Sequence, residues 1–167
     1  YDALQILKIL KQRAKAGLKI YSSNKLQKVA ALTYRDCNSD VRIAIKTLYY
    51  SVTEPKNSIE TNFERAQKDI FIDLISNLND KNLLILEAVR QSKEKFVKEI
   101  YTNYLKLSSE KHEQPFSYVH FYNNLSYLQS LGLILLLSTK VNRAYTNRVN
   151  LTFNEKTLES IYNLRLN

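Results

Sequence analysis

Apolar residues recur every three or four positions through the first half of the chain, a spacing that predicts helices. Gly17 offers an end for the first helix, since glycine is common just after a helix. Ser22 or Ser23 can cap the second helix and Asp40 the third, because short polar side chains accept hydrogen bonds from first-turn N–H groups. The four predicted helices have apolar faces over residues 4–14, 26–33, 41–48 and 63–74.

A second series of elements follows "NLND", residues 77–80. Helical spacing returns over residues 84–89, 97–107 and 117–128. The next stretch, "LILLLSTKVNRAYTNRVNLTF" at 133–153, changes from aliphatic residues to a polar segment and then to alternation. This pattern predicts two short strands joined by a basic turn, and a terminal helix follows near residues 155–166.

Three helices followed by a two-stranded hairpin form the element order of a winged helix. In that fold the third helix can enter the major groove of DNA, and the hairpin, or wing, lies alongside. The predicted fold class is therefore mainly α. We expect a four-helix unit with a connecting helix over residues 1–79, and a winged-helix (helix-turn-helix) domain with a two-stranded β-hairpin wing over residues 80–167.

Positive charge dominates the sequence, with 25 Lys and Arg against 16 Asp and Glu and a net charge of +9. This balance favours an anionic partner such as nucleic acid, a phosphorylated ligand or an acidic membrane surface. No acidic residue lies between Glu113 and Glu155, a window that contains the third helix and the wing. Because a surface near phosphates must lack carboxylates, this window predicts DNA binding. The alternative is that it only reflects a local richness in Asn and Tyr.

Patterns typical of catalysis, metal binding and membrane insertion are missing from the sequence. We find no nucleophile motif or recognisable carboxylate pair, so we predict no catalytic residue and no enzyme activity for this chain. His112 has no metal-ligating residue at suitable spacing, so no metal site is expected. The single cysteine, Cys37, is expected in the core. No apolar stretch approaches the ~18 residues of a membrane span, and the absence of methionine suggests a piece of a longer protein.

The third helix of the second series offers a surface for reading bases. If Leu125 points to the core, Tyr118 and Tyr122 lie on the same side at about 100° per residue. Other polar positions then face outward, where asparagine can read adenine and histidine can donate or accept a hydrogen bond. A solvated polar face is the alternative interpretation. The predicted DNA-binding residues of this helix are Ser117, Val119, His120, Asn123, Asn124 and Tyr127.

The predicted wing supplies the cations. A basic tip can enter a minor groove or straddle its phosphates, because narrow A·T-rich grooves concentrate negative potential. The tip lacks glycine, so an asparagine must supply any turn residue with positive φ. The predicted wing residues are Lys140, Asn142, Arg143, Tyr145, Asn147 and Arg148.

Five segments carry a resemblance to a known family: "YDALQILKILKQRAKAGL", "NSDVRIAIKTL", "IYTNYLKL", "EQPFSYVHFYNNLSYLQSLGLI" and the basic hairpin. Together they resemble the C-terminal part of the archaeal origin-recognition initiators, the Orc/Cdc-type AAA+ proteins. The resemblance implies that the four-helix unit is an ATPase lid and that the rest is a winged-helix domain that binds origin DNA. It also implies a missing N-terminal ATPase core that binds ATP or ADP with Mg. No cofactor is expected in this fragment, which has no G-x-x-x-x-G-K-S/T phosphate loop.

The chain departs from the family at two places. The family usually has "GDAR" in the third lid helix, whose arginine reaches the ATP phosphates. The match here is "SDVR", so the resemblance gives Arg42 a nucleotide-sensing role, only together with the missing core. Without the resemblance, a surface arginine beside Asp36 or Asp40 is the simpler interpretation. Several relatives have two arginines where this chain has Val119 and His120, which weakens the case for phosphate or guanine contacts from that helix.

The sequence therefore predicts sequence-specific binding of double-stranded DNA, at origins, by the C-terminal part of a replication-initiator-like AAA+ protein whose parent is an ATPase. One alternative is a transcription regulator on the same scaffold that binds promoter DNA. An alternative of another class is a protein-interaction module that docks an acidic partner. Besides DNA, the expected partners are the missing ATPase core and other initiator subunits or a replicative helicase, with no membrane. The expected location is cytoplasmic, associated with the nucleoid.

Overall fold

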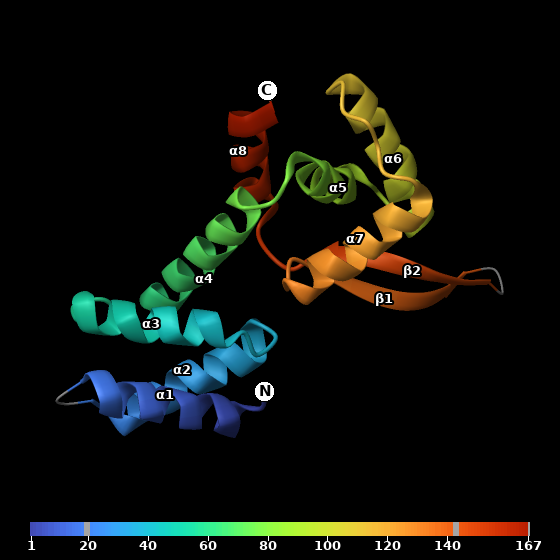
Figure 1. The fold of residues 1–167 in the computed structure, drawn as a ribbon. Coiled ribbons are helices and arrows are strands. Elements are labelled where there is room, and N and C mark those ends of the chain that lie inside the picture. Colours follow the sequence, from blue (N-terminus) through green and yellow to red (C-terminus); the bar gives the residue numbers. More distant parts are fainter. Residues whose placement is uncertain (19–20, 142–143, 167) are drawn as a thin grey trace. The chain divides into compact units, whose positions relative to one another are not determined.

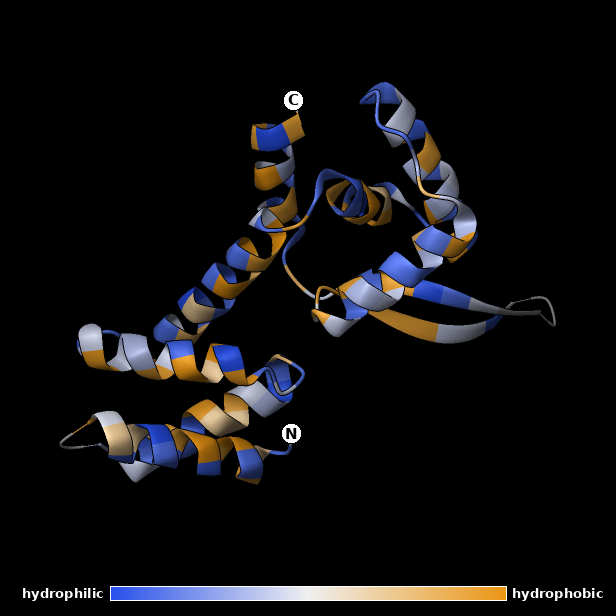
Figure 2. Ribbon diagram, viewed as in Figure 1, coloured by the Kyte–Doolittle hydropathy of each residue, from blue (hydrophilic) through white to orange (hydrophobic). Residues whose placement is uncertain are grey.

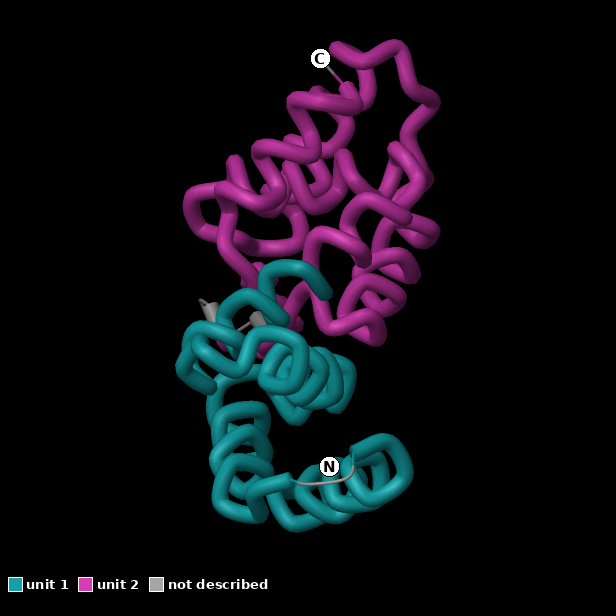
Figure 3. The backbone as a smooth tube through the Cα atoms, turned by 90° about the vertical axis from the view of Figure 1, so that its left-hand side faces the viewer, with its two compact units in different colours: residues 1–70 teal, residues 71–167 magenta. Residues whose placement is uncertain are grey.

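The computed structural model describes residues 1–18, 21–141 and 144–166, with the side chains of residues 141–145 outside the described part. The chain divides into two compact units, Tyr1–Ile70 and Phe71–Asn167 (Figure 3). Within the described ranges it forms eight helices and one antiparallel hairpin (Figure 1). The prediction of a mainly α chain with a two-stranded hairpin is confirmed.

Polar caps begin the helices of unit 1. Asp2, Ser22 and Asp40 each accept a hydrogen bond from an N–H group in the first turn of a helix. Of the two serines that the sequence offers for the second helix, Ser22 is the cap. Unit 1 consists of α1 (Ala3–Gly17), α2 (Ser23–Asp36), α3 (Val41–Thr53) and the first part of α4 (Ile59–Ser76).

Two small hydrophobic clusters hold unit 1 together. Each cluster joins residues of at least two helices, so the helices bury apolar faces against one another. The first cluster comprises Ile6, Leu10, Ala14, Leu26, Val29, Ala30 and Ala44, and the second comprises Cys37, Ile43, Tyr50, Phe63 and Ala66.

Leu4 and Ile45 lie outside these clusters, although the sequence pattern placed both on buried faces. Leu4 is 76% exposed and Ile45 is 37% exposed. Leu4 precedes the fully buried Ile6 by two positions, and Ile45 follows the fully buried Ile43 by two positions. Two positions correspond to about 200° around a helix, so both side chains face away from the core.

Helix α5 is the centre of unit 2. Its residues from Leu83 to Leu86 are all fully buried, and consecutive residues of a helix point in four different directions. Helix α5 is contacted by α6, α7, α8 and β2, and these elements cover it from several sides (Figure 1). The elements of unit 2 after α4 are α5 (Asp80–Gln91), α6 (Val97–Glu110), α7 (Tyr118–Ser130), β1 (Ile134–Val141), β2 (Ala144–Leu151) and α8 (Glu155–Leu166).

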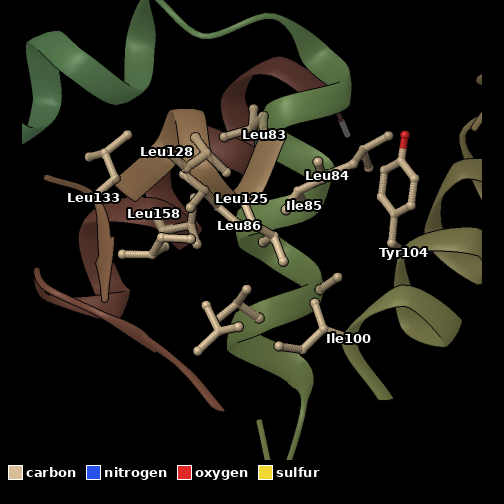
Figure 4. Packing of buried hydrophobic residues seen from close by; sticks show 14 of the residues in the cluster. Leu83, Leu84, Ile85, Leu86, Ile100, Tyr104, Leu125, Leu128, Leu133 and Leu158 are labelled. Carbon is tan, nitrogen blue, oxygen red and sulfur yellow. The ribbon is translucent and has the colours of Figure 1, made fainter. Parts of the chain in front are cut away.

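The core of unit 2 is a single hydrophobic cluster around α5. Figure 4 shows Leu84 and Ile85 of α5 near Tyr104 of α6, and Leu86 near Leu125 of α7. Fully burying a leucine-sized side chain stabilises a fold by about 1.5–3 kcal/mol. The packing of α6, α7 and α8 against α5 therefore depends on many such contributions at once.

Glu87 places a carboxylate inside this core, with only 1% of the residue exposed. Arg90 donates to both of its oxygens, from Nε at 2.8 Å and from Nη2 at 2.6 Å, and Gln91 Nε2 donates at 2.7 Å. The hydrogen bonds that Arg90 donates to Glu87 raise the pKa of Arg90. A buried charge is tolerated when it is paired and hydrogen-bonded in this way.

Strands β1 and β2 form a regular antiparallel hairpin, in which Ile134 is opposite Leu151 and Lys140 is opposite Tyr145. Figure 2 shows that β1 changes from hydrophobic residues at its base to hydrophilic residues toward the turn. The base packs into the core through Ile134 and Val149. The hairpin is therefore anchored at one end and extends from the core at the other.

The free edge of β2 is held by a loop that the sequence did not indicate. The Val149 N–H group donates to the Lys95 carbonyl at 2.8 Å, and Phe96 forms a bridge with Arg148. The Glu99 carboxylate accepts hydrogen bonds from the backbone N–H groups of residues 93, 94 and 95, at 2.9, 3.1 and 3.0 Å. Glu99 thus holds the loop of residues 93–95 in place, and this loop in turn holds the edge of β2.

A side-chain hydrogen bond joins the hairpin to α7. Asn147 of β2 donates from Nδ2 to the hydroxyl oxygen of Tyr122 at 2.6 Å. Both residues are half-buried, so water competes less for the two groups than it would at an open surface. The bond sets the position of β2 against the predicted DNA-reading helix.

The compact units divide between residues 70 and 71. The predicted domains, which divide between residues 79 and 80, stay a prediction. Phe71, Ile75 and Leu78 belong to the core of unit 2. Arg165 of α8 donates from Nη1 to the Leu78 carbonyl at 2.6 Å, which ties the same segment to unit 2. A helix end is visible in a sequence, but the core that a helix joins depends on distant residues.

We expect a fragment of residues 71–167 to be more stable than a fragment of residues 80–167. The shorter fragment loses Phe71, Ile75 and Leu78 from its core, which should lower its free energy of unfolding by about 3 kcal/mol or more. Urea denaturation of both fragments, followed by circular dichroism, measures the difference. Equal unfolding midpoints would show that the unit 2 core does not need these residues.

Replacing Tyr122 by phenylalanine should lower the free energy of unfolding by about 1 kcal/mol, because the half-buried Asn147 amide loses its partner. Tyr127→Phe is the matched control, since Tyr127 lies on the same helix with its side chain exposed. Adding Asn147→Ala to Tyr122→Phe should cost less than Asn147→Ala costs alone. Equal losses in Tyr122→Phe and Tyr127→Phe would contradict the assignment.

Candidate nucleic-acid interface

The start of α7 is fixed by two tyrosines of α6. The Phe116 N–H group donates to the Tyr104 hydroxyl at 3.0 Å, and the Tyr101 hydroxyl donates to the Phe116 carbonyl at 3.1 Å. Burial raises the pKa of Tyr104, which keeps its hydroxyl protonated. Ser117 then caps α7 by accepting a hydrogen bond from the His120 N–H group. These contacts set the direction in which the helix begins.

The buried face of α7 determines which side chains reach solvent. Phe121, Leu125 and Leu128 are fully buried against the core. Residues on the opposite side are exposed, as expected for a helix with one apolar stripe. Within α7 itself, the predicted residues that are exposed are Val119, at 67%, Tyr127, at 48%, and His120 and Asn123.

Tyr118 differs from its predicted place on the buried side. Its ring packs against the rings of Tyr101 and Phe121, with centroid distances of 5.0 and 6.4 Å. These rings cover part of the side chain, and 47% of the residue stays exposed. Tyr118 is the first residue of α7, so the outward surface of the helix begins with an aromatic group.

Three polar residues of α7 and its cap are used differently. Ser117 serves as the N-cap, and Asn124 donates from Nδ2 to the His120 carbonyl at 2.8 Å. Asn123 is exposed, and its side chain forms no hydrogen bond with the described residues. An amide without an internal partner can offer both a donor and an acceptor to a base edge. Among the predicted asparagines that the structure describes, Asn123 is therefore best placed for the predicted reading of bases.

Two cations of the hairpin lie on opposite faces. Lys140 and Arg148 are both exposed. Side chains alternate along a strand, so Lys140 shares a face with Ser138. Asn147, which pairs with Ser138 across the hairpin, lies on the same face and reaches α7. Arg148 lies on the other face, opposite Leu137. The predicted residues Asn142 and Arg143, and the side chain of Tyr145, lie outside the described residues.

The two faces of the hairpin also differ in their surroundings. On the side of Thr146 and Arg148, a groove of about 410 Å³ includes the carboxylates Glu94 and Glu99 in its lining. The side that carries Lys140 adjoins α7, within the segment that contains no acidic residue. Phosphates are therefore better accommodated by α7 and the adjoining face of the hairpin than by the groove beside Glu94 and Glu99.

Arg42, the predicted nucleotide-sensing residue, binds Asp40. Its guanidinium donates to the Asp40 carboxylate from Nε at 2.9 Å and from Nη2 at 2.6 Å, and this contact raises the pKa of Arg42. Asp40 is also the N-cap of α3. Arg42 thus supports the start of α3, and its role toward a nucleotide stays a prediction.

Cys37 is buried, as the sequence predicted. Burial raises the pKa of its thiol to about 12, and the carboxylates of Asp36 and Asp40 add to the effect. A thiol with this pKa is protonated at neutral pH and is a poor nucleophile.

Across the described ranges there is no group of three or more His, Cys, Asp or Glu that could hold a metal ion. In the same ranges, none of the helices has the length and apolarity to cross a bilayer.

Sequence reasoning missed the residues that position the interface. The sequence placed Tyr122 on the core side of its helix and gave no role to Tyr101 or Tyr104, but each has its hydroxyl hydrogen-bonded to a specific polar group. Glu99 was missed too, although an acid in the first turn of a helix is a recognisable capping signal. These residues support the elements on which the described predicted residues lie.

No protein-family model matches the sequence, and no curated protein sequence matches it. Among solved structures, the chain is similar over 99% of its length to the Aeropyrum pernix ORC1 protein in complex with DNA, with a TM-score of 0.74 and 19% identity. Two further similar structures are Cdc6p from Pyrobaculum aerophilum, with a TM-score of 0.45 and 22% identity, and the Aeropyrum pernix ORC2 protein, with a TM-score of 0.45 and 17% identity.

The chain spans about half the length of these proteins, since the matches cover 47%, 50% and 46% of the ORC1, Cdc6p and ORC2 chains. The likeness to ORC1 extends over both units of the chain. The resemblance to archaeal Orc/Cdc-type initiators that the sequence carries is thereby confirmed, at the level of the fold.

Proposed function

We propose that this chain is the DNA-binding part of a replication-initiator-like AAA+ protein, and that α7 and the β1–β2 hairpin bind double-stranded DNA. The observation that carries the proposal is an exposed polar side of α7 next to a hairpin with cations, in a segment without carboxylates. The fold is that of part of an ORC1 protein whose structure was solved with DNA. In this proposal unit 2 is a winged-helix domain.

Helix and hairpin have different tasks in this proposal. Asn123 can pair with the N6 and N7 groups of adenine, and Val119 can contact a thymine methyl group. Lys140 and Arg148 supply the charge that attracts phosphates, on the two faces of the hairpin. A hairpin that enters a minor groove would thus present one cation to each strand of the duplex. The helix selects bases, and the hairpin supplies most of the affinity.

The proposal places this chain beside an ATPase core in a longer protein. Unit 1 with the end of α4 then forms the lid, and Arg42 reaches the phosphates of ATP or ADP after leaving Asp40. The proposal expects no nucleotide site within this chain, whose sequence has two glycines, Gly17 and Gly132, and no G-x-x-x-x-G-K-S/T phosphate loop. The ATPase core, other initiator subunits and a replicative helicase are the proposed protein partners.

A transcription regulator on the same scaffold is the second candidate. It is favoured by Val119 and His120, which stand where several relatives have two arginines in the recognition helix. A change at these positions would alter the bases that α7 reads and direct the protein to promoters. Footprinting across the source genome separates the two, since protected sites lie at origins in one case and at promoters in the other.

Titration of duplex DNA at several salt concentrations tests the DNA-binding proposal itself. The logarithm of the binding constant should fall linearly with the logarithm of salt concentration, by about 0.9 for each phosphate contact. No measurable binding at low salt would favour the alternative of a module that docks an acidic protein.

Replacing Lys140 or Arg148 by glutamine should weaken binding to every duplex to a similar extent and reduce the salt slope by about one unit. The double variant should reduce the slope by about two units. Lys98→Gln is the matched control, because Lys98 is exposed but lines the groove that contains Glu94 and Glu99. An unchanged slope in both single variants would mean that the hairpin is an ordinary solvated loop.

Replacing Asn123 by alanine should cost about 1–3 kcal/mol on the preferred site and little on random DNA, since it removes a base contact and no charge. Gln129→Ala, at another exposed position of α7, is the control. Competition binding with specific and random duplexes measures both losses. An equal loss on the two duplexes would show that Asn123 does not read bases.

A further inference from the structure

One face of α1 forms a groove that the proposed DNA interface does not use. The groove has a volume of about 470 Å³ and opens between α1 and the residue that precedes the cap of α2. Among the described residues, its lining combines three lysines with apolar and aromatic groups and contains no acidic residue. The lining residues are Leu4, Leu7, Lys8, Lys11, Gln12, Lys15 and Tyr21.

The three lysines of this groove lie in line along the helix. Lys8, Lys11 and Lys15 are separated by three and four positions, which places them on one side of α1. At about 1.5 Å per residue, the line is about 10 Å long. It is directed away from the buried stripe of Ile6 and Leu10. All three lysines are exposed, so a partner can reach the whole line.

The charge of these lysines is not balanced within unit 1. None of the three forms an ion pair with the described residues, whereas four carboxylates of unit 1 pair with other cations. The Asp2 carboxylate at the start of α1 is used in the helix cap. The pairs elsewhere in unit 1 are Glu60 with Lys28, Asp36 with Arg35, Asp40 with Arg42, and Glu54 with Arg65.

We propose that this groove docks an acidic amphipathic segment of another protein. The lysine line attracts carboxylates, and the exposed side chain of Leu4, with Leu7 and Tyr21, offers an apolar contact to the same segment. Duplex DNA would use the lysines but leave Leu4 without a partner, since its backbone presents phosphates and sugars. A segment that places acidic and apolar residues at helical spacing satisfies both parts of the groove.

The two kinds of contact have different roles. Exposed ion pairs contribute little one by one, so three parallel lysines give direction and charge preference more than affinity. The apolar contact supplies burial and lowers the dissociation rate. Removal of either kind should therefore weaken binding, and only the lysine contribution should depend strongly on salt.

Fluorescence anisotropy with the full chain tests the proposal. The probe is a labelled peptide of about 15 residues in which glutamate and leucine repeat at helical spacing. Lys11→Gln should weaken its binding about threefold, and the Lys8→Gln/Lys11→Gln/Lys15→Gln variant about tenfold. Leu4→Gln should also weaken it about threefold, with no change in salt dependence. Arg13→Gln, an exposed cation on α1 outside the groove, is the matched control and should leave binding unchanged.

Two further arms separate this groove from the DNA interface. A peptide with every leucine replaced by glutamine should bind at least threefold more weakly, and an unlabelled duplex should not displace the labelled peptide. The proposal would be overturned if the two peptides bound equally well, or if the triple lysine variant bound the peptide as well as the unchanged chain. It would also be overturned if the duplex displaced the peptide equally well from the unchanged chain and from the Lys140→Gln variant. Circular dichroism of the exposed-residue variants confirms that they are folded.

Discussion

Burial of the middle of α5, from Asn82 to Val89, is the constraint on which unit 2 depends. A helix with fully buried residues at consecutive positions from Leu83 to Leu86 is unstable in water unless other elements cover every side of it. Helices α6, α7 and α8 and strand β2 supply that cover (Figure 4). Because each element is needed to shield the same helix, their positions are not independent.

The interface follows from this arrangement. Helix α7 must turn Phe121 and Leu125 to the core, so its remaining side, with Asn123, faces solvent. The hairpin must anchor Val149 in the same core, while its polar half extends beyond it. Glu99 and the Tyr122–Asn147 bond then hold the hairpin in place. The candidate DNA surface is thus formed by the parts of the covering elements that the core does not use.

Local patterns predicted much of this molecule, and contacts between distant residues account for the rest. Periodicity and caps were enough to place the helices and the hairpin, and to turn Asn123 outward on α7. They could not show that Phe71 joins the second core, that Tyr118 stays half exposed, or that Asn147 is bonded to α7. Each of these depends on a partner many positions away. The cations of the hairpin were visible as residue types, but the face that each occupies required the strand register.

The most direct test of the central claim is an NMR titration of the full chain with duplex DNA at about physiological salt, followed through backbone amide signals. Our account predicts that the signals that shift or broaden most belong to α7 and to the β1–β2 hairpin, with those of Val119, Asn123 and Lys140 among them. It also predicts that the signals of unit 1 stay nearly unchanged. Changes confined to unit 1, or unchanged signals in α7 and the hairpin at saturating duplex, would contradict the assignment of the DNA interface.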